Sequence, residues 1–264
     1  MGCDMNAFSL AGKKAFVTGG AKKTGLCYGM AVALHDAGAE IVILDANSQV
    51  ENTVAELGGA KSGYHAVVAN LLDLNDLSNG FQQAISALGG RLDILVNGAG
   101  LQYRCPSEEF PEDAWDRIMG VNIKGVFFMS QLAGKVMLKQ GKGKIINIAS
   151  TNSFIGLRNM PAYVSSKGGV KQLTMALSSE WSGRGINVNA IAPGYMDTEM
   201  NVALTDPKNP KFTQQRYDEL TQRIPAHRWG TPDDMKGCCI FLASHASDYL
   251  GGAIIPVDGG YLVM

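Results

Sequence analysis

Residues 15–45 read AFVTGGAKKTGLCYGMAVALHDAGAEIVILD, and this stretch decides the fold. Apolar runs at Ala15–Thr18 and Ile41–Asp45 predict two buried strands, and the apolar period over residues 25–37 predicts a helix between them. A glycine-rich turn joins the first strand to the helix. Such a turn presents backbone N–H groups and a helix N-terminus to an anion, so the stretch predicts a phosphate cradle.

The same stretch contains the residues that would select a cofactor. Gly19 and Gly25 shape the turn, and Asp45 ends the second strand twenty residues after Gly25. A carboxylate there accepts hydrogen bonds from both adenosine ribose hydroxyls and repels a 2′-phosphate, which favours NAD(H) over NADP(H). Lys22 and Lys23 oppose this interpretation, because a lysine in the turn could hold a 2′-phosphate, so NADP(H) stays open. Asp45 could also be a simple turn residue.

Apolar runs and helical periods alternate along the whole chain. The remaining predicted strands are Tyr64–Ala69, Ile94–Asn97, Lys144–Ala149, Asn187–Ala192 and Ala253–Val257. The remaining predicted helices cover about residues 48–57, 74–88, 112–139, 161–182 and 232–243. Apolar strands that alternate with helices predict an α/β fold, a doubly wound parallel sheet with helices on both faces. No linker or internal repeat divides the sequence, so we expect residues 1–264 to form one domain.

Composition excludes several classes of protein. The 264 residues are 46% hydrophobic and 18% charged with a net charge of −1, which is typical of a globular protein and argues against disorder. The sequence has no basic run, so nucleic acid is not an expected partner. No apolar run is long enough to cross a membrane, and the first residues lack the apolar core of a signal peptide. We therefore expect no membrane partner and a cytoplasmic location.

Cysteine and histidine form no metal-binding pattern. The cysteines are odd in number and irregularly spaced, which fits neither a disulfide framework nor a metal site; they are Cys3, Cys27, Cys105, Cys238 and Cys239. The histidines are scattered, at His35, His65, His227 and His245. We expect no metal ion and a reducing compartment.

Residues 150–167, STNSFIGLRNMPAYVSSK, carry three groups that can move a proton together. Ser150 ends a buried-strand pattern, and Tyr163 and Lys167 lie four residues apart on one face of the predicted helix. A free tyrosine ionises near pH ~10, and a nearby ammonium lowers that pKa. The phenol can then exchange a proton with the oxygen of an alcohol or ketone, while the serine hydroxyl holds the same oxygen. A Y-x3-K pair alone is common on helices and decides nothing.

Four motifs taken together identify a family. The three groups just described have the spacing S-x12-Y-x3-K, residues 97–100 read NGAG, residues 193–198 read PGYMDT, and Asn122 precedes the serine. In these motifs the chain resembles the short-chain dehydrogenases/reductases over essentially its whole length. The resemblance implies a Rossmann-type parallel sheet of seven strands, an enzyme that acts on CH–OH groups with a nicotinamide dinucleotide, and a homotetramer.

The resemblance also implies roles for single residues. Tyr163 would be the general acid or base, Lys167 would lower the pKa of Tyr163 and hold the nicotinamide ribose, and Ser150 would bind the substrate oxygen. Asn122 would keep a helix distorted and hold a water that relays protons. The implied cofactor-binding set is Gly19, Thr24, Gly25, Leu26, Asp45, Asn70, Leu71, Asn97, Ala99, Gly100, Tyr163, Lys167, Pro193, Gly194, Met196 and Thr198.

The chain departs from the family pattern at three places. The glycine-rich turn, residues 18–27, is two residues longer than the usual TGxxxGxG, and Cys27 replaces its last glycine. Gly98 replaces the second asparagine of NNAG, and Asn70 stands where an aspartate often faces the adenine. We expect Cys27 to displace the following helix slightly, because a glycine there lets the helix pack closely on the sheet. We expect Leu71 to lie against the adenine ring.

Within the family, the sequence resembles the group of gluconate 5-dehydrogenases and 2-dehydro-3-deoxy-D-gluconate 5-dehydrogenases. The segments that carry this likeness are FFMSQLAGK, GKIINIAS, INVNAIAPGYM, RIPAHRWGTPDD and FLASHASDYLGG. A sugar acid needs a cation for its carboxylate, and Arg104 and Arg158 are candidates for a bidentate pair. Both arginines could instead be solvated or structural. Residues 200–223 directly follow PGYMDT and are polar, so we expect a lid over the site, with a fixed surface loop as the alternative.

Three interpretations of the function stay open. The preferred one is hydride transfer between NAD(H) and a secondary hydroxyl or ketone of a sugar or sugar acid. The second is a reductase of neutral ketoses or polyols, or of bulkier apolar ketones of the steroid or acyl type. The third, from another class, is a dinucleotide-binding sensor without catalysis. Such sensors commonly lose the tyrosine or the lysine, and this chain keeps both.

Overall fold

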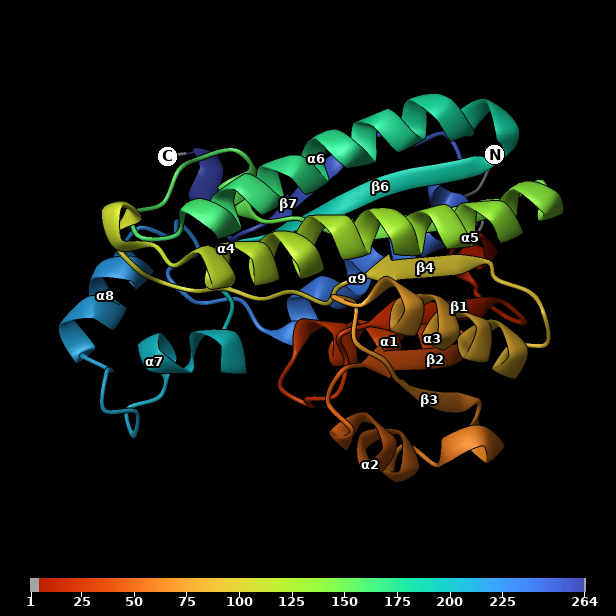
Figure 1. The fold of residues 1–264 in the computed structure, drawn as a ribbon, viewed down its shortest axis with the longest axis horizontal. Coiled ribbons are helices and arrows are strands. Elements are labelled where there is room, and N and C mark those ends of the chain that lie inside the picture. Colours follow the sequence, from red (N-terminus) through yellow and green to blue (C-terminus); the bar gives the residue numbers. More distant parts are fainter. Residues whose placement is uncertain (1–4, 264) are drawn as a thin grey trace.

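The computed structural model describes residues 5–263 and confirms a parallel sheet of seven strands (Figure 1). The strands are β1 (Lys14–Thr18), β2 (Glu40–Asp45), β3 (Tyr64–Val68), β4 (Ile94–Asn97), β5 (Gly143–Ile148), β6 (Ile186–Pro193) and β7 (Ile254–Val257). Their order across the sheet is β3-β2-β1-β4-β5-β6-β7, and every pairing is parallel. Every predicted strand is present, with bounds that differ by at most one residue at either end.

Helices cover both faces of this sheet. The first face carries α1 (Leu26–Asp36), α2 (Gln49–Glu56) and α9 (Pro232–Ala243), and the second carries α3 (Leu74–Ala87), α5 (Val126–Gln140) and α6 (Pro161–Trp181). Two separate apolar cores result. In β1, for example, Ala15 and Val17 belong to one core and Phe16 to the other. Burial on both faces is the reason that the strands read as continuous apolar runs.

The helix predicted over about residues 112–139 is present, but it is not α-helical throughout. The segment is divided into α4 (Glu112–Met119), a π-helical turn (Gly120–Gly125) and α5. The turn contains Asn122, whose fully buried amide accepts a hydrogen bond from the Leu101 N–H (2.8 Å) and donates one to the Leu101 carbonyl (2.9 Å). Periodicity does not reveal the break, because the apolar pattern continues through the wider turn.

Short helices fill the remaining connections. α7 (Val202–Thr205) and α8 (Gln214–Gln222) lie in the segment expected to be a lid and project from one end of the molecule (Figure 1). Short 3₁₀ helices occur at Met5–Phe8, Gly59–Ser62, Ser107–Glu109, Thr151–Ser153, Ser182–Arg184, Glu199–Asn201, His245–Ser247 and Tyr261–Val263. Among the helices of residues 5–263, none is both long and apolar enough to cross a membrane. Cys3 lies outside the described residues.

A buried polar network ties the central strands to the helices of the second face. The Asn97 amide donates to Ser130 Oγ and to Asn147 Oδ1, both at 2.9 Å. The Asn147 amide donates in turn to Thr174 Oγ1 at 2.9 Å. All four side chains are at most 3% exposed. A satisfied network in a low dielectric is strongly directional, so these bonds fix β4 and β5 against α5 and α6.

Candidate active site

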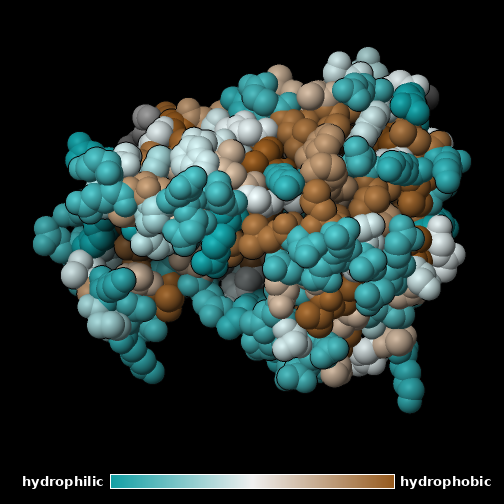
Figure 2. All heavy atoms as spheres, in the orientation of Figure 1, coloured by the Kyte–Doolittle hydropathy of each residue, from teal (hydrophilic) through white to brown (hydrophobic). Residues whose placement is uncertain are grey.

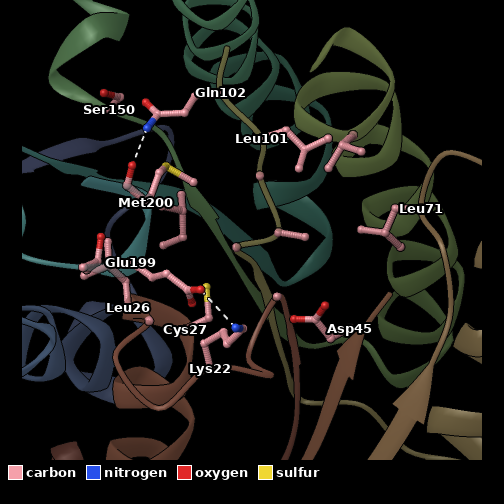
Figure 3. Close-up of a pocket in the computed structure, with 18 of the residues that line it drawn as sticks. Lys22, Leu26, Cys27, Asp45, Leu71, Leu101, Gln102, Ser150, Glu199 and Met200 are labelled. Atoms are coloured by element: carbon pink, nitrogen blue, oxygen red, sulfur yellow. Dashed lines mark hydrogen bonds and ion pairs between the residues drawn. The ribbon is translucent and has the colours of Figure 1, made fainter. Parts of the chain in front are cut away.

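The strands of the sheet end at one edge, and a large pocket opens there, as expected for a parallel sheet of this type. Its volume is about 870 Å³, and its lining includes residues that follow β1, β2, β3, β4, β5 and β6. Figure 3 shows Asp45 and Leu71 on one side of this pocket and Ser150 across it. The pocket therefore collects the ends of strands that are far apart in the sequence.

The glycine-rich turn forms one wall of the pocket at the start of α1. Gly25 is the N-cap of α1, and no side chain caps the N–H groups of the first helical turn. Those groups can therefore receive an anion. Gly19 has a φ of +87°, and a Cβ there would lie less than 3.0 Å from the backbone of Ala99. Only glycine lets the turn approach the loop after β4 so closely.

The Asp45 carboxylate enters the pocket from the end of β2. It accepts a hydrogen bond from the Ala21 N–H at 3.0 Å and another from the Asn47 N–H at 3.0 Å. Asp45 is therefore more than a turn residue, because its side chain also holds the glycine-rich turn in place. The side chain lies on the side of the pocket where the sequence predicts the adenosine ribose.

Both lysines of the turn are paired with glutamates. Lys22 Nζ lies 3.0 Å from Glu199 Oε1, a contact between the turn and the segment after β6 that Figure 3 marks with a dashed line. Lys23 pairs with Glu56 at the end of α2. A 2′-phosphate would have to displace a carboxylate to reach either ammonium.

Ser150, Tyr163 and Lys167 all line the large pocket, from the end of β5 and from the first two turns of α6. Ser150 Oγ accepts a hydrogen bond from the Asn152 N–H at 3.1 Å. Lys167 Nζ lies 5.8 Å from the centre of the Tyr163 ring and donates a hydrogen bond to the Ile148 carbonyl at 2.6 Å. The structure thus confirms that the three groups predicted to act together meet in one pocket.

Burial dominates the ionisation of these groups. It lowers the pKa of the Lys167 ammonium to about 8 and raises the pKa of the Tyr163 phenol above its ordinary value. The Ser150 hydroxyl and the Arg104 guanidinium lower the pKa of Tyr163 without overcoming burial. The Lys167 ammonium is directed at the Ile148 carbonyl. The lowering of the Tyr163 pKa by Lys167 stays a prediction.

Asn122 lies outside the pocket but positions two elements that line it. Besides bonding to Leu101, its amide donates to Ser166 Oγ at 3.1 Å, and Ser166 Oγ donates to the Tyr163 carbonyl at 2.8 Å. Asn122 therefore connects the loop after β4 to the helix that carries Tyr163. The distorted helix expected at Asn122 is confirmed. The water relay at this residue stays a prediction.

A second, smaller pocket beside Ser150 and Tyr163 contains Arg104 and Tyr195. None of the ion pairs or hydrogen bonds found among residues 5–263 involves Arg104. Arg158 is exposed and lines neither pocket. Of the two arginines proposed from the sequence, the structure brings only Arg104 to the catalytic groups.

Most of the cofactor residues expected from the sequence line the large pocket, namely Gly19, Gly25, Leu26, Asp45, Asn70, Leu71, Ala99, Gly100, Tyr163, Lys167, Pro193, Gly194, Met196 and Thr198. Two do not. Asn97 is turned into the buried network, and Thr24 is exposed on the turn. The lining residues that sequence reasoning missed include Gln102, Glu199, Met200 and Asn201. A signal was available, because these residues follow directly on the NGAG and PGYMDT motifs.

These residues fit a nicotinamide dinucleotide. The uncapped start of α1 and the tight turn at Gly19 suit a pyrophosphate, and Asp45 suits the hydroxyls of a ribose. Lys167 stands at the other end, where its ammonium can reach a second ribose. Among residues 5–263, no three His, Cys, Asp or Glu side chains gather in a way that could hold a metal ion.

Comparison with known proteins agrees with this geometry. Residues 19–262 match a family model described as Enoyl-(Acyl carrier protein) reductase, which is a model of the short-chain dehydrogenases/reductases. The chain belongs to the short-chain dehydrogenase/reductase family. It is therefore an enzyme, a nicotinamide-dependent oxidoreductase that acts on CH–OH groups, which confirms the enzyme interpretation over that of a sensor.

Three relatives show how far the likeness of this dehydrogenase/reductase extends. A 2-dehydro-3-deoxy-D-gluconate 5-dehydrogenase of Escherichia coli (strain K12) is 45% identical, and the match covers 98% of each chain. A gluconate 5-dehydrogenase of Gluconobacter oxydans (strain 621H) is 36% identical over 97% of each chain. The crystal structure of a gluconate 5-dehydrogenase from Burkholderia cenocepacia J2315, in complex with NADP and tartrate, is 36% identical, has a TM-score of 0.90 and covers 98% of each chain.

Replacing Lys167 by Met is expected to stabilise the fold while it abolishes turnover. Because the folded enzyme lowers the pKa of Lys167 to about 8, folding at pH 7 requires the burial of an ammonium that prefers water. Lys167→Met removes that cost, so the free energy of unfolding at pH 7 should rise by on the order of 2 kcal/mol. The gain should shrink between pH 8 and 10.5, where the unfolded lysine also loses its proton.

Chemical denaturation from pH 6.5 to 10 measures this dependence. Lys135→Met is the matched control, because Lys135 is exposed on α5 and should show no such trend. A gain at Lys167→Met that stays constant across this range, or a loss at pH 7, would contradict the burial argument.

Proposed function

We propose that the enzyme transfers a hydride between NAD(H) and a secondary hydroxyl or ketone of a gluconate-like sugar acid. The observation that carries this proposal is Arg104, a guanidinium without an ion pair among residues 5–263, in the small pocket beside Ser150 and Tyr163. A guanidinium binds a carboxylate through two parallel hydrogen bonds. The names of the relatives support the same class, since gluconate and the tartrate of the Burkholderia structure are both hydroxy acids.

In the proposed mechanism, the chain's own groups hold the substrate oxygen and move its proton. A bound nicotinamide supplies or accepts the hydride. The Ser150 hydroxyl donates a hydrogen bond to the substrate oxygen and fixes its position. The Tyr163 phenol gives this oxygen a proton in reduction and takes it back in oxidation. The Lys167 ammonium and the Arg104 guanidinium provide positive charge near the phenolate that forms.

Arg104→Met is expected to weaken the use of a keto-sugar acid far more than that of a neutral ketose. Loss of a charge-assisted hydrogen bond of about 1.5–3 kcal/mol corresponds to a fall in kcat/KM of about 10- to 100-fold. Initial rates with NADH, a 5-keto-sugar acid, a neutral ketose and an apolar cyclic ketone measure this selectivity. Arg158→Met separates the two arginines, because its exposed side chain should leave all three rates unchanged.

Tyr163→Phe is the control for the mechanism itself, and it should abolish turnover of every substrate while NADH binding persists. An Arg104→Met enzyme that loses the acid and the neutral substrate equally would exclude Arg104 as the carboxylate anchor. Turnover of only neutral or apolar ketones by the unaltered enzyme would replace the sugar-acid proposal with the second interpretation of the sequence.

Asp45→Asn is expected to reduce the proposed preference for NADH. The substitution removes the charge that would repel a 2′-phosphate, and it retains an oxygen that can accept a hydrogen bond from Ala21. The ratio of kcat/KM for NADH to that for NADPH should fall by about tenfold or more, equivalent to ~1.4 kcal/mol. Asp36→Asn, an exposed carboxylate at the end of α1, is the control. An unaltered enzyme that prefers NADPH would refute Asp45 as the selector and make Lys22 the candidate ligand.

We propose that residues 200–223 act as a lid. Met200 and Asn201 line both pockets, so the start of this segment lies at the catalytic groups. Two contacts hold it across the large pocket, the ion pair of Glu199 and a hydrogen bond of 2.6 Å from the Gln102 amide to the Met200 carbonyl (Figure 3). NADH should slow limited proteolysis within the segment. An unchanged cleavage rate would favour the fixed surface loop.

We propose that the enzyme is a homotetramer. Figure 2 shows apolar side chains gathered over α5 and α6 on one face of the molecule. Apolar residues that remain partly accessible on these helices include Phe128, Leu132, Leu173 and Met175. A continuous apolar face of this kind is typical of a contact between subunits. Light scattering on a sizing column should give the mass of four chains of 28.1 kDa each, and a monomeric mass would contradict the proposal.

A further inference from the structure

Two of the departures from the family pattern occupy the same space. Cys27 stands where the family pattern has glycine, and Gly98 stands where it has asparagine. In the structure, Cys27 Sγ fills the place that a side chain at position 98 would enter. A Cβ on Gly98 would lie far closer to Sγ than the 3.0 Å that real Cβ atoms keep from their neighbours. A sulfur atom at position 27 and a Cβ at position 98 therefore cannot both occupy these places, whereas the Cβ of residue 27 leaves room.

The shared space lies where two loops of the cofactor pocket meet. Cys27 belongs to the first turn of α1, Gly98 belongs to the loop after β4, and both residues line the large pocket. The two loops are also joined by Thr18 Oγ1, which accepts hydrogen bonds from the N–H of Gly98 at 3.1 Å and of Ala99 at 3.2 Å. The Cys27 side chain thus fills the gap between two segments that already touch through their backbones.

The Cys27 thiol has the properties of a packing group. It is 5% exposed, and burial raises its pKa to about 12, so it stays protonated at neutral pH. A buried protonated thiol behaves as a small apolar side chain and reacts poorly. Gly98 provides the room for this thiol, which reduces the need for the shift of α1 that we expect from the sequence.

We propose that Cys27 is a positioning residue for the cofactor: its side chain sets the spacing between the glycine-rich turn and the loop after β4, and with it the affinity for the dinucleotide. The family pattern has a side chain on the loop and glycine on the helix, whereas this chain has the side chain on the helix and glycine on the loop. Positions 27 and 98 are therefore functionally coupled. The coupling concerns dinucleotide binding alone and depends neither on the substrate nor on the preference for NAD(H).

A double-mutant cycle on NADH binding tests this coupling. Gly98 has no positive φ, so Gly98→Ala adds no backbone strain, and the new methyl group meets Cys27 Sγ first. The NADH dissociation constant, measured by fluorescence titration, should rise about tenfold or more in Gly98→Ala and about threefold or less in Cys27→Ala. The double variant should bind within about threefold of Cys27→Ala, because the next atom met by the methyl, the Thr18 carbonyl oxygen, is 3.1 Å away.

Cys239→Ala is the matched control, since Cys239 is a fully buried cysteine on α9 that lines neither pocket. Combined with Gly98→Ala, it should leave NADH binding as weak as Gly98→Ala alone. Additive effects at positions 27 and 98, equal rescue by Cys239→Ala, or a lower melting temperature with an unchanged NADH dissociation constant would each overturn the proposal. If Gly98→Ala does not fold, a double variant that folds and binds NADH supports the proposal, and one that is unfolded or binds weakly overturns it.

Discussion

The side-chain amide of Asn122 is the contact on which the geometry of the site depends. It bonds to both polar groups of the Leu101 backbone and to the hydroxyl of Ser166, which bonds in turn to the carbonyl of Tyr163. An unsatisfied buried polar group costs about 1–3 kcal/mol, so a fully buried amide keeps these partners. The loop after β4 and the helix that carries Tyr163 consequently share one anchor. The π-helical turn is what brings that amide between them.

The sequence predicts well the strands, the helices and the residues that share a helix face, because periodicity over a few residues and burial determine them. The central strands are recognised because both faces of each are buried. Tyr163 and Lys167 are placed together because residues four apart share a helix face. Asn97 shows where this reasoning ends. Its position directly before the NGAG glycine suggests the cofactor pocket, but its side chain points into the core toward Ser130 and Asn147. Only the register of the assembled sheet decides between these two directions.

Contacts between segments that are far apart in the sequence are the part of the site that could not be predicted. Lys22 and Glu199 are 177 residues apart, and the sequence around neither residue indicates that they form an ion pair. From the sequence alone, Arg104 and Arg158 are equally plausible as the residue that binds a substrate carboxylate. The loop after β4 brings Arg104 into the small pocket beside Ser150 and Tyr163, while Arg158, in the loop before α6, lines neither pocket. The coupling of Cys27 with Gly98 is of the same kind. The two residues depart from separate motifs, and only the structure shows that side chains at these two positions would occupy the same space.

Burial gives the catalytic groups a definite resting state. With the pKa of Lys167 lowered to about 8 and that of Tyr163 raised, the lysine is still mostly charged at pH 7 and the phenol is neutral. Each group therefore holds its proton before a substrate arrives. A phenol that starts protonated is ready to donate to a ketone oxygen, whereas alcohol oxidation must begin with proton loss from Tyr163. Burial in the pocket thus keeps the Tyr163 phenol protonated near neutral pH, and the positive charge of Arg104 offsets part of the rise in its pKa.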